Sequence, residues 1–183
     1  MIRKLSFDEI FSTRPSLNEL KKKDRLPLYA LAENIRSMHN VGSLFRTSDG
    51  VRLQQLILSG YTARPPRREI DKTALGATDS VPWEFTADPV PKLKELKNQG
   101  VQLVVVEHTS ASVPYSEADY TFPLCLIMGN EVDGVSEEVI AQADLAVEIP
   151  MLGLKQSLNV SVAYGIVMYH ILNRYMNEYP LPA

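Results

Sequence analysis

The segment IPMLGLKQSLNVSVAYGIVMYHIL, Ile149–Leu172, carries the strongest structural signal in this sequence. A short predicted strand leads into it, and a predicted helix begins near Ser157. Nearly every residue from Leu158 to Leu172 is apolar or small. Because a helix that is apolar on all sides is buried on several sides, we expect it to pack against the protein's own sheet and against a second copy of the chain. Ser157 and Asn159 lie at its N-terminal end, beside unpaired backbone N–H groups that favour a polar binding site.

Length and composition are those of one globular domain, with 183 residues of which 45% are apolar. No apolar run is long enough to span a bilayer, and no secretory signal pattern begins the sequence. The single cysteine, Cys125, has no partner for an internal disulfide. We therefore expect a cytoplasmic location and no membrane association. A net charge of −3 argues against nucleic-acid binding through overall charge but leaves local basic patches open.

Strand and helix patterns alternate along the chain, which is typical of α/β proteins. Apolar runs predict strands at residues 28–32, 55–59, 83–85, 101–107 and 123–128, and periodic patterns predict helices at 41–49, 69–77, 92–98 and 136–143. Several strands are apolar throughout, as in parallel strands covered on both faces. We expect a largely parallel sheet with helices on both faces, preceded by two short helices that Pro15 separates within residues 7–23.

Three polar clusters follow predicted strands, at the edge where open parallel sheets bind ligands. They are Asn34–Arg46, then Met128–Gly134, and finally the pair Ser157 and Asn159. Each cluster alone has a structural interpretation: helix caps for Asn40 and Ser157, a solvated helix face for Arg46, and a simple turn for residues 130–134.

Several kinds of site are missing from the sequence. It contains no glycine-rich dinucleotide motif and no phosphate-binding loop. Histidine and cysteine are too few and too scattered for a zinc site, and Glu131 with Asp133 in a glycine-ended turn is weak support for magnesium, so we expect no metal. His170, within the apolar helix, is expected to be a hydrogen-bonded core residue.

Together the clusters resemble the three signature motifs of the SpoU/TrmH branch of the SPOUT superfamily, which are RNA ribose 2′-O-methyltransferases. The matching strings are NVGSLFRT at 40–47, IMGNEVDGVS at 127–136 and IPMLGLKQSLNVSVA at 149–163, with a further match in KTALGATDSVPWE at 72–84. The resemblance runs from about Leu28 to Tyr169. It implies an N-terminal helical extension at residues 1–27 and a SPOUT methyltransferase domain at 28–183.

This resemblance implies a C-terminal deep trefoil knot, a homodimer with sites at its interface, and S-adenosylmethionine as cofactor. Threaded chains are rare, so the residues alone would not predict the knot. By motif position, the cofactor pocket is expected to be lined, mostly through backbone groups, by Glu107, His108, Gly129, Ile149, Met151 and Leu158. Apolar walls with a few backbone donors and acceptors suit adenine and a sulfonium.

The resemblance also assigns the polar functional positions, which are Asn40, Arg46, Glu131, Ser157 and Asn159. The family gives Arg46 the role of activating the ribose hydroxyl. A free arginine is a poor base because its pKa lies above about 12. We therefore expect its guanidinium to hold a phosphate and stabilise the developing alkoxide. Either a substrate phosphate oxygen or Glu131 would take the proton, or Glu131 would only orient Asn40 and Arg46.

The expected RNA contacts are basic side chains, several of them in a proline-rich loop: Arg36, Arg46, Arg64, Arg67 and Arg68. Transfer RNA and ribosomal RNA are both open as substrates, and the short chain favours transfer RNA. One alternative is a catalytically inactive knotted protein that only binds RNA or the cofactor, although the intact set of polar positions argues against it. Another is a generic nucleotide-binding α/β enzyme, which would lack a phosphate loop.

Overall fold

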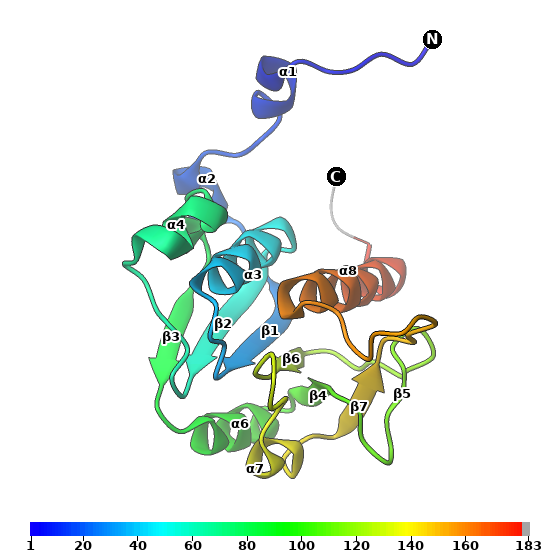
Figure 1. The fold of residues 1–183 in the computed structure, drawn as a ribbon. Helices are drawn as coiled ribbons and strands as arrows, with labels where there is room; N and C mark the ends of the chain where they lie inside the picture. Colours follow the sequence, from blue (N-terminus) through cyan, green and yellow to red (C-terminus); the bar gives the residue numbers. More distant parts are fainter. Residues whose placement is uncertain (181–183) are drawn as a thin grey trace.

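Seven parallel strands form the sheet in the computed structural model, which describes residues 1–180 (Figure 1). In chain order the strands are β1 (Leu26–Glu33), β2 (Leu53–Ser59), β3 (Trp83–Thr86), β4 (Gln102–Val106), β5 (Val113–Pro114), β6 (Leu124–Met128) and β7 (Leu145–Glu148). Their order across the sheet is β3-β2-β1-β6-β4-β7-β5, and every adjacent pair is parallel. The predicted α/β fold with a largely parallel sheet is confirmed.

Helices cover both faces of the sheet (Figure 1). One face carries α3 (Met38–Gly50), α4 (Arg68–Ala74), α5 (Ala77–Ser80) and α8 (Val160–Glu178), and the other carries α6 (Pro89–Asn98) and α7 (Glu137–Ile140). The central strand β6 is buried throughout and alternates between two cores: Leu124 and Leu126 pack with the first face, whereas Cys125 and Ile127 pack with the second. This two-sided burial explains the continuous apolar runs in the sequence.

The C-terminal helix α8 differs from the prediction in where it begins. It begins at Val160 and not near Ser157, because the Asn159 side chain accepts a hydrogen bond from the Ser161 N–H at 2.9 Å and caps the helix there. As predicted, it packs against the protein's own sheet. Val162, Ile166 and Tyr169 remain exposed on one face.

His170 is not the hydrogen-bonded core residue that was expected. Its Nε2 is buried without a hydrogen-bond partner among residues 1–180. The ring packs edge-on against Tyr115, with 5.2 Å between ring centres, and against Tyr120 at 5.9 Å. The Tyr120 hydroxyl donates to the Tyr115 carbonyl at 2.6 Å, and no hydrogen bond joins it to His170 Nε2 within residues 1–180. Burial lowers the pKa of His170 accordingly.

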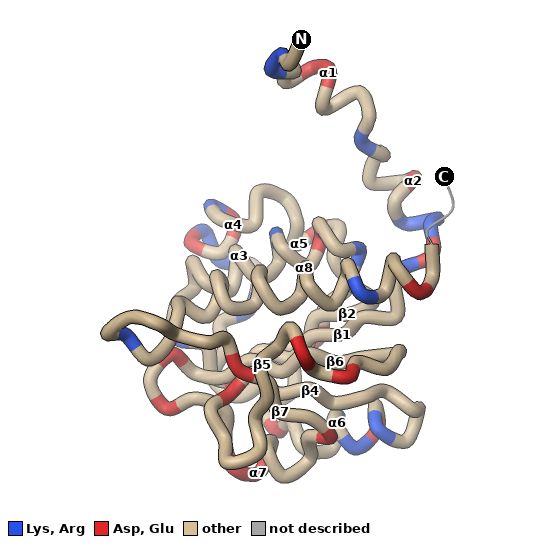
Figure 2. Tube along the Cα trace, turned by 90° about the vertical axis from the view of Figure 1, so that its right-hand side faces the viewer, with Lys and Arg blue, Asp and Glu red and all other residues tan. Residues whose placement is uncertain are grey.

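The first helices, α1 (Phe7–Phe11) and α2 (Leu17–Lys22), project away from the sheet in both views (Figures 1 and 2). They are separate helices on either side of Pro15, as predicted. Each begins with a capping box, built by Ser6 with Glu9 and by Ser16 with Glu19. In residues 1–180 we find no helix with the length and apolar character needed to cross a membrane. Residues 181–183 of the expected 28–183 domain lie outside the described residues.

Candidate active site and cofactor pocket

The candidate site lies at the carboxyl edge of the sheet, where β1, β6, β4 and β7 end side by side. The segments that follow these strands carry the three signature motifs and His108. Because β6 is inserted between β1 and β4, chain segments far apart in sequence meet at this edge. In open α/β sheets, ligands bind in the crevice at such a point.

Three motif residues form one hydrogen-bonded cluster at this edge. The Asn40 Nδ2 donates to Glu131 Oε1 at 2.8 Å, and the Asn159 Nδ2 donates to Asn40 Oδ1 at 3.2 Å. Asn40 lies in the first turn of α3, Glu131 follows β6, and Asn159 caps α8. The structure therefore joins one residue from each of the three motifs. We call Asn40, Glu131 and Asn159 the amide–carboxylate cluster.

The Glu131 carboxylate also accepts hydrogen bonds from two backbone N–H groups, those of Arg36 at 3.1 Å and Ser37 at 3.3 Å. Partial burial acts to raise the pKa of Glu131, but the hydrogen bonds from Asn40 and the backbone outweigh it. The pKa of Glu131 consequently lies below its ordinary value. An ionised carboxylate with this many donors holds the start of α3 in place and is a weak base.

Asn130 holds the loop after β6 in place through hydrogen bonds of its side chain. Its side chain is buried and donates to the Asn34 carbonyl at 2.9 Å and to the Tyr61 hydroxyl at 2.5 Å. Its Oδ1 accepts from the N–H groups of Val132 at 2.7 Å and Asp133 at 2.8 Å. A backbone bridge to Gly134, whose φ is +72°, closes the turn. The loop after β6 is therefore more than a simple turn, because Asn130 ties it to the segments that follow β1 and β2.

A pocket of about 300 Å³ opens between this loop and the segment that precedes α8. All six residues expected to contact the cofactor line it, namely Glu107, His108, Gly129, Ile149, Met151 and Leu158. Its walls include the apolar side chains Val106, Met128 and Val160. A side chain at Gly129 would collide with the backbone of Gly134 and Val135, so only glycine lets this turn fold over the pocket. A mixed lining of apolar and polar residues fits a ligand with a flat adenine, a polar ribose and a charged methionyl group.

Glu107 lines the pocket, but its carboxylate has a structural task. Its Oε2 accepts from the Val135 N–H at 2.9 Å, and its Oε1 accepts from the His108 N–H at 2.8 Å. The carboxylate thus ties the end of β4 to the loop after β6.

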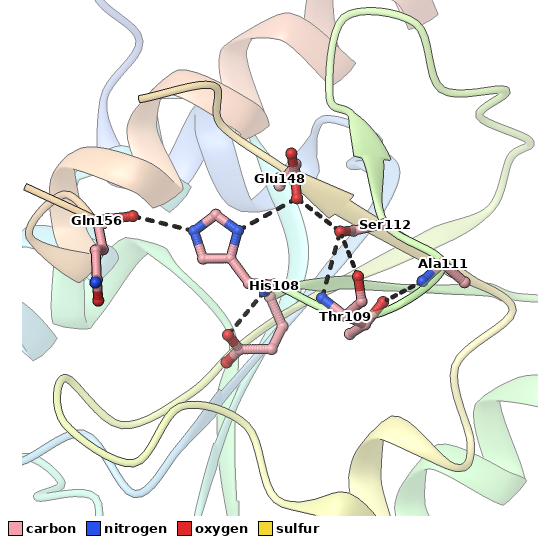
Figure 3. A network of polar contacts seen from close by, with 7 residues as sticks. His108, Thr109, Ala111, Ser112, Glu148 and Gln156 are labelled. Atoms are coloured by element: carbon pink, nitrogen blue, oxygen red, sulfur yellow. Dashed lines mark hydrogen bonds and ion pairs between the residues drawn. The ribbon is translucent and has the colours of Figure 1, made fainter. Parts of the chain in front are cut away.

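His108 holds the segment between β7 and α8 (Figure 3). Its Nδ1 lies 3.2 Å from Glu148 Oε2, and its Nε2 lies 3.0 Å from the Gln156 carbonyl oxygen. Ser112 donates to the same Glu148 oxygen at 2.7 Å. The Gln156 carbonyl and then the Glu148 carboxylate raise the pKa of His108, and the Ser112 and His108 hydrogen bonds lower that of Glu148. We call His108, Glu148 and Gln156 the histidine clamp.

The two remaining motif residues lie outside the cluster. Ser157 is exposed and lines the pocket. Arg46 lies on α3 but lines a different surface hollow, together with Lys72 and Tyr169. Within residues 1–180 it makes neither a hydrogen bond nor an ion pair, and the structure does not bring it to Glu131.

The arginines expected to contact RNA are all exposed. Arg36 adjoins the amide–carboxylate cluster through its backbone. Arg67 and Arg68 begin α4, where Figure 2 shows both basic and acidic residues, and Arg64 lies over the Phe85 ring at 4.1 Å from its centre.

Sequence reasoning missed the supporting residues Asn130, Glu148 and Tyr61. Asn130 stands inside a quoted motif, but its composition fits an ordinary turn equally well. Glu148 and Tyr61 carried no local signal, because their partners lie 40 and 69 residues away in the sequence.

Comparison with known proteins agrees with this geometry. The model of the SpoU rRNA methylase family matches residues 27–169. A tRNA (guanosine(18)-2′-O)-methyltransferase from Aquifex aeolicus is 41% identical over 157 residues, covering 84% of this chain and 72% of that protein. The crystal structure of the A. aeolicus TrmH/SpoU tRNA modifying enzyme superposes with a TM-score of 0.80 and 35% identity, covering 88% of this chain and 83% of that one.

An S-adenosylmethionine-bound rRNA methyltransferase from Sinorhizobium meliloti is also similar. It has a TM-score of 0.75 and 27% identity, covering 86% of this chain and 60% of that chain. The matched region contains every residue of the amide–carboxylate cluster and of the cofactor pocket. This chain therefore belongs to the SpoU family of S-adenosylmethionine-dependent RNA ribose 2′-O-methyltransferases.

Proposed function

We propose that this protein methylates the ribose 2′-hydroxyl of a guanosine in transfer RNA. The observation that carries the proposal is that Asn40, Glu131 and Asn159 are hydrogen-bonded to one another beside a pocket that fits S-adenosylmethionine. The name of the A. aeolicus relative supports the choice of tRNA guanosine. Ribosomal RNA is the second candidate substrate, because the S. meliloti relative is an rRNA methyltransferase.

The pocket residues have distinct tasks toward the cofactor, which supplies an electrophilic methyl group when bound. The residues that would hold it are Glu107, His108, Gly129, Ile149, Met151 and Leu158. Apolar side chains exclude water from the reacting atoms, and backbone groups of the loop after β6 orient the ligand. The histidine clamp keeps the segment before α8 closed over this space.

The polar residues of the site have different roles toward the RNA. Glu131 is a positioning residue, since its carboxylate is engaged by Asn40 and by the backbone at Arg36. Arg46 binds the phosphate beside the target ribose and stabilises negative charge that develops on the 2′-oxygen. Ser157 and Asn159 fix the segment before α8 against the nucleotide. The basic residues Arg36, Arg64, Arg67 and Arg68 bind the RNA backbone.

A homodimer completes the site. Val162, Ile166 and Tyr169 form an exposed apolar stripe along α8. Asn159, at the start of this helix, contacts Asn40, whereas Tyr169 lines the hollow that contains Arg46. A two-fold dimer that packs α8 antiparallel to its copy places the Tyr169 end of one helix beside the Asn159 end of the other. Arg46 of one protomer then approaches the amide–carboxylate cluster of its partner.

The dimer can be tested with a matched pair of charge insertions. Ile166→Asp places a carboxylate in the stripe, and Val113→Asp places one on the edge strand β5; both wild-type residues are 36% exposed. We expect the wild type and Val113→Asp to sediment as dimers, and Ile166→Asp to sediment as an inactive monomer that still binds S-adenosylmethionine. A monomeric wild type would contradict the proposal.

We also infer that the C-terminal segment forms the trefoil knot that the resemblance implies. Support comes from residues 149–159, which are held both to the loop after β4, through His108 and Gln156, and to α3, through Asn159 and Asn40. The extension at 1–27, the domain at 28–183 and the cytoplasmic location remain predictions.

The decisive experiment supplies labelled S-adenosylmethionine and separate pools of unmodified tRNA and rRNA, followed by digestion to nucleosides and mass spectrometry. We expect 2′-O-methylguanosine from the tRNA pool. The same product from rRNA alone would select the second substrate. A methylated base would overturn the ribose mechanism. Cofactor binding with no transfer to either pool would favour the catalytically inactive binding protein.

A further inference from the structure

A second hollow lies at the same edge of the sheet, beside the cofactor pocket but sharing no lining residue with it. Its volume is about 320 Å³. It forms where β2 and β3 end, and it is lined by Met38, Gly60, Tyr61, Thr62, Ala63, Arg64, Arg67 and Phe85. We call it the Tyr61 groove. Nothing in the roles assigned above to the cofactor or to the target ribose uses it.

Tyr61 presents a fixed aromatic ring to this groove. The residue is 59% exposed, so much of its surface is open to a ligand. Its hydroxyl accepts from the Asn130 side chain at 2.5 Å, and its backbone N–H donates to the Asn34 side chain at 3.1 Å. An exposed ring held at both ends loses little entropy when a flat ligand stacks on it.

The groove also carries positive charge without a matching carboxylate. Arg64 and Arg67 line it, and neither forms an ion pair within residues 1–180. Arg64 instead lies over the Phe85 ring, at 4.1 Å from its centre. An aromatic platform with two unpaired guanidinium groups matches the chemistry of a nucleotide, which has a flat base and an anionic phosphate.

We propose that the Tyr61 groove binds a nucleobase of the RNA substrate that neighbours the methylated nucleotide. The base stacks on Tyr61, and Arg64 and Arg67 bind the adjoining phosphate. Because the Tyr61 hydroxyl bonds to Asn130, the groove is physically connected to the loop that lines the cofactor pocket. The inference rests on the proposed RNA substrate and adds a base-recognition subsite to it.

Two substitutions of Tyr61 separate stacking from support of the loop. Tyr61→Phe keeps the ring and removes the hydrogen bond to Asn130, whereas Tyr61→Ala removes both. We expect Tyr61→Ala to weaken binding of unmodified tRNA about tenfold, the effect of one lost base stack. Tyr61→Phe should bind tRNA within about twofold of the wild type, and both variants should bind S-adenosylmethionine normally. An equal loss of tRNA affinity in both variants, with weaker cofactor binding, would show that Tyr61 only supports Asn130 and would overturn the proposal.

The salt dependence of binding gives an independent measurement. Tyr61→Ala should leave the slope of log affinity against log salt unchanged, while Arg64→Gln or Arg67→Gln should each reduce it by about one. Unaltered tRNA affinity in Tyr61→Ala would overturn the subsite while leaving the methyltransferase proposal intact, provided that the wild type methylates the tRNA. A wild type that neither binds nor methylates tRNA or rRNA would overturn both.

Discussion

Asn40 and Arg46 lie on the same helix, α3, but their surroundings differ completely. Asn40 is bonded on both sides, to Glu131 and to Asn159. Arg46 lies in an open hollow with Tyr169 and makes no hydrogen bond or ion pair within residues 1–180. The first turn of the helix thus belongs to the protein's own hydrogen-bond network, whereas Arg46, farther along it, lies beside Tyr169 of α8.

In the proposed function, this difference divides the site into two halves. The chain arranges by itself the half that binds the cofactor and positions the nucleotide, and the half that stabilises developing charge depends on a second copy of the chain. Cofactor binding should therefore be a property of one protomer, whereas methyl transfer should require the dimer.

The largest effect is expected from Arg46→Ala, which removes the guanidinium group that has no hydrogen bond within the described chain. The rate of methyl transfer should fall by at least about 10²-fold, the usual cost of losing one group that stabilises charge in a transition state. S-adenosylmethionine affinity, measured by calorimetry, should stay within a few-fold because Arg46 does not line the cofactor pocket. Arg46→Lys keeps the charge but not the bidentate geometry and should recover only part of the rate. An active Arg46→Ala enzyme would remove Arg46 from the mechanism.

Substitutions of Glu131 test the hydrogen bonds that hold Asn40. Glu131→Ala should slow methyl transfer by on the order of 10- to 100-fold, because Asn40 and the backbone at Arg36 lose their common acceptor. Glu131→Gln keeps an oxygen acceptor for Asn40 and should recover most of the rate with an unchanged pH profile. If Glu131 instead takes the proton, Glu131→Gln should be as inactive as Glu131→Ala.

The sequence was informative wherever one segment determined its own structure. The apolar run predicted at residues 28–32 is the core of β1, Leu26–Glu33, and the buried strand β6 lies within the run predicted at 123–128. The start of α8 was misplaced because its cap depends on how the Asn159 side chain is used, and both Ser157 and Asn159 are good capping residues. The two-residue strand β5 is too short to produce any periodic pattern.

The sequence predicted which residues belong to the site but not which of them contact one another. Motif matching named Asn40, Arg46 and Glu131 together, yet only the structure separates Arg46 from the other two. The histidine clamp depends on residues 40 and 48 positions beyond His108, which meet it only because β7 lies next to β4. Such contacts follow from topology, and no local pattern encodes them.

Mixing the two slowed variants tests whether Arg46 of one protomer and Glu131 of its partner form one site. Arg46→Ala and Glu131→Ala are unfolded together and refolded at equal concentration. Half of the dimers are then mixed, and each mixed dimer has one site with both residues intact, so activity should recover to roughly a quarter of the wild type. The control is each variant refolded alone. No recovery would place Arg46 and Glu131 of the same protomer in one site.

The smallest effect is expected from pH, which should change S-adenosylmethionine affinity through the histidine clamp. The raised pKa of His108 means that its contribution is complete below its ordinary value of 6.5 and is lost as pH rises through the folded-state pKa. The lowered pKa of Glu148 means that its contribution is present above 4.5 and is lost as pH falls through the folded-state pKa. The clamp is therefore strongest in mildly acidic solution.

Because the His108 pair is partly exposed, the wild type should lose only about two- to fivefold in S-adenosylmethionine affinity between mildly acidic and mildly alkaline pH, relative to His108→Gln. His39→Gln is the control, since the His39 side chain is outside the clamp, and it should keep the wild-type dependence. The shift should be the same in Ile166→Asp, because the clamp lies within one protomer. A pH dependence that disappears on monomerisation would mean that the cofactor half, too, is completed by the second copy.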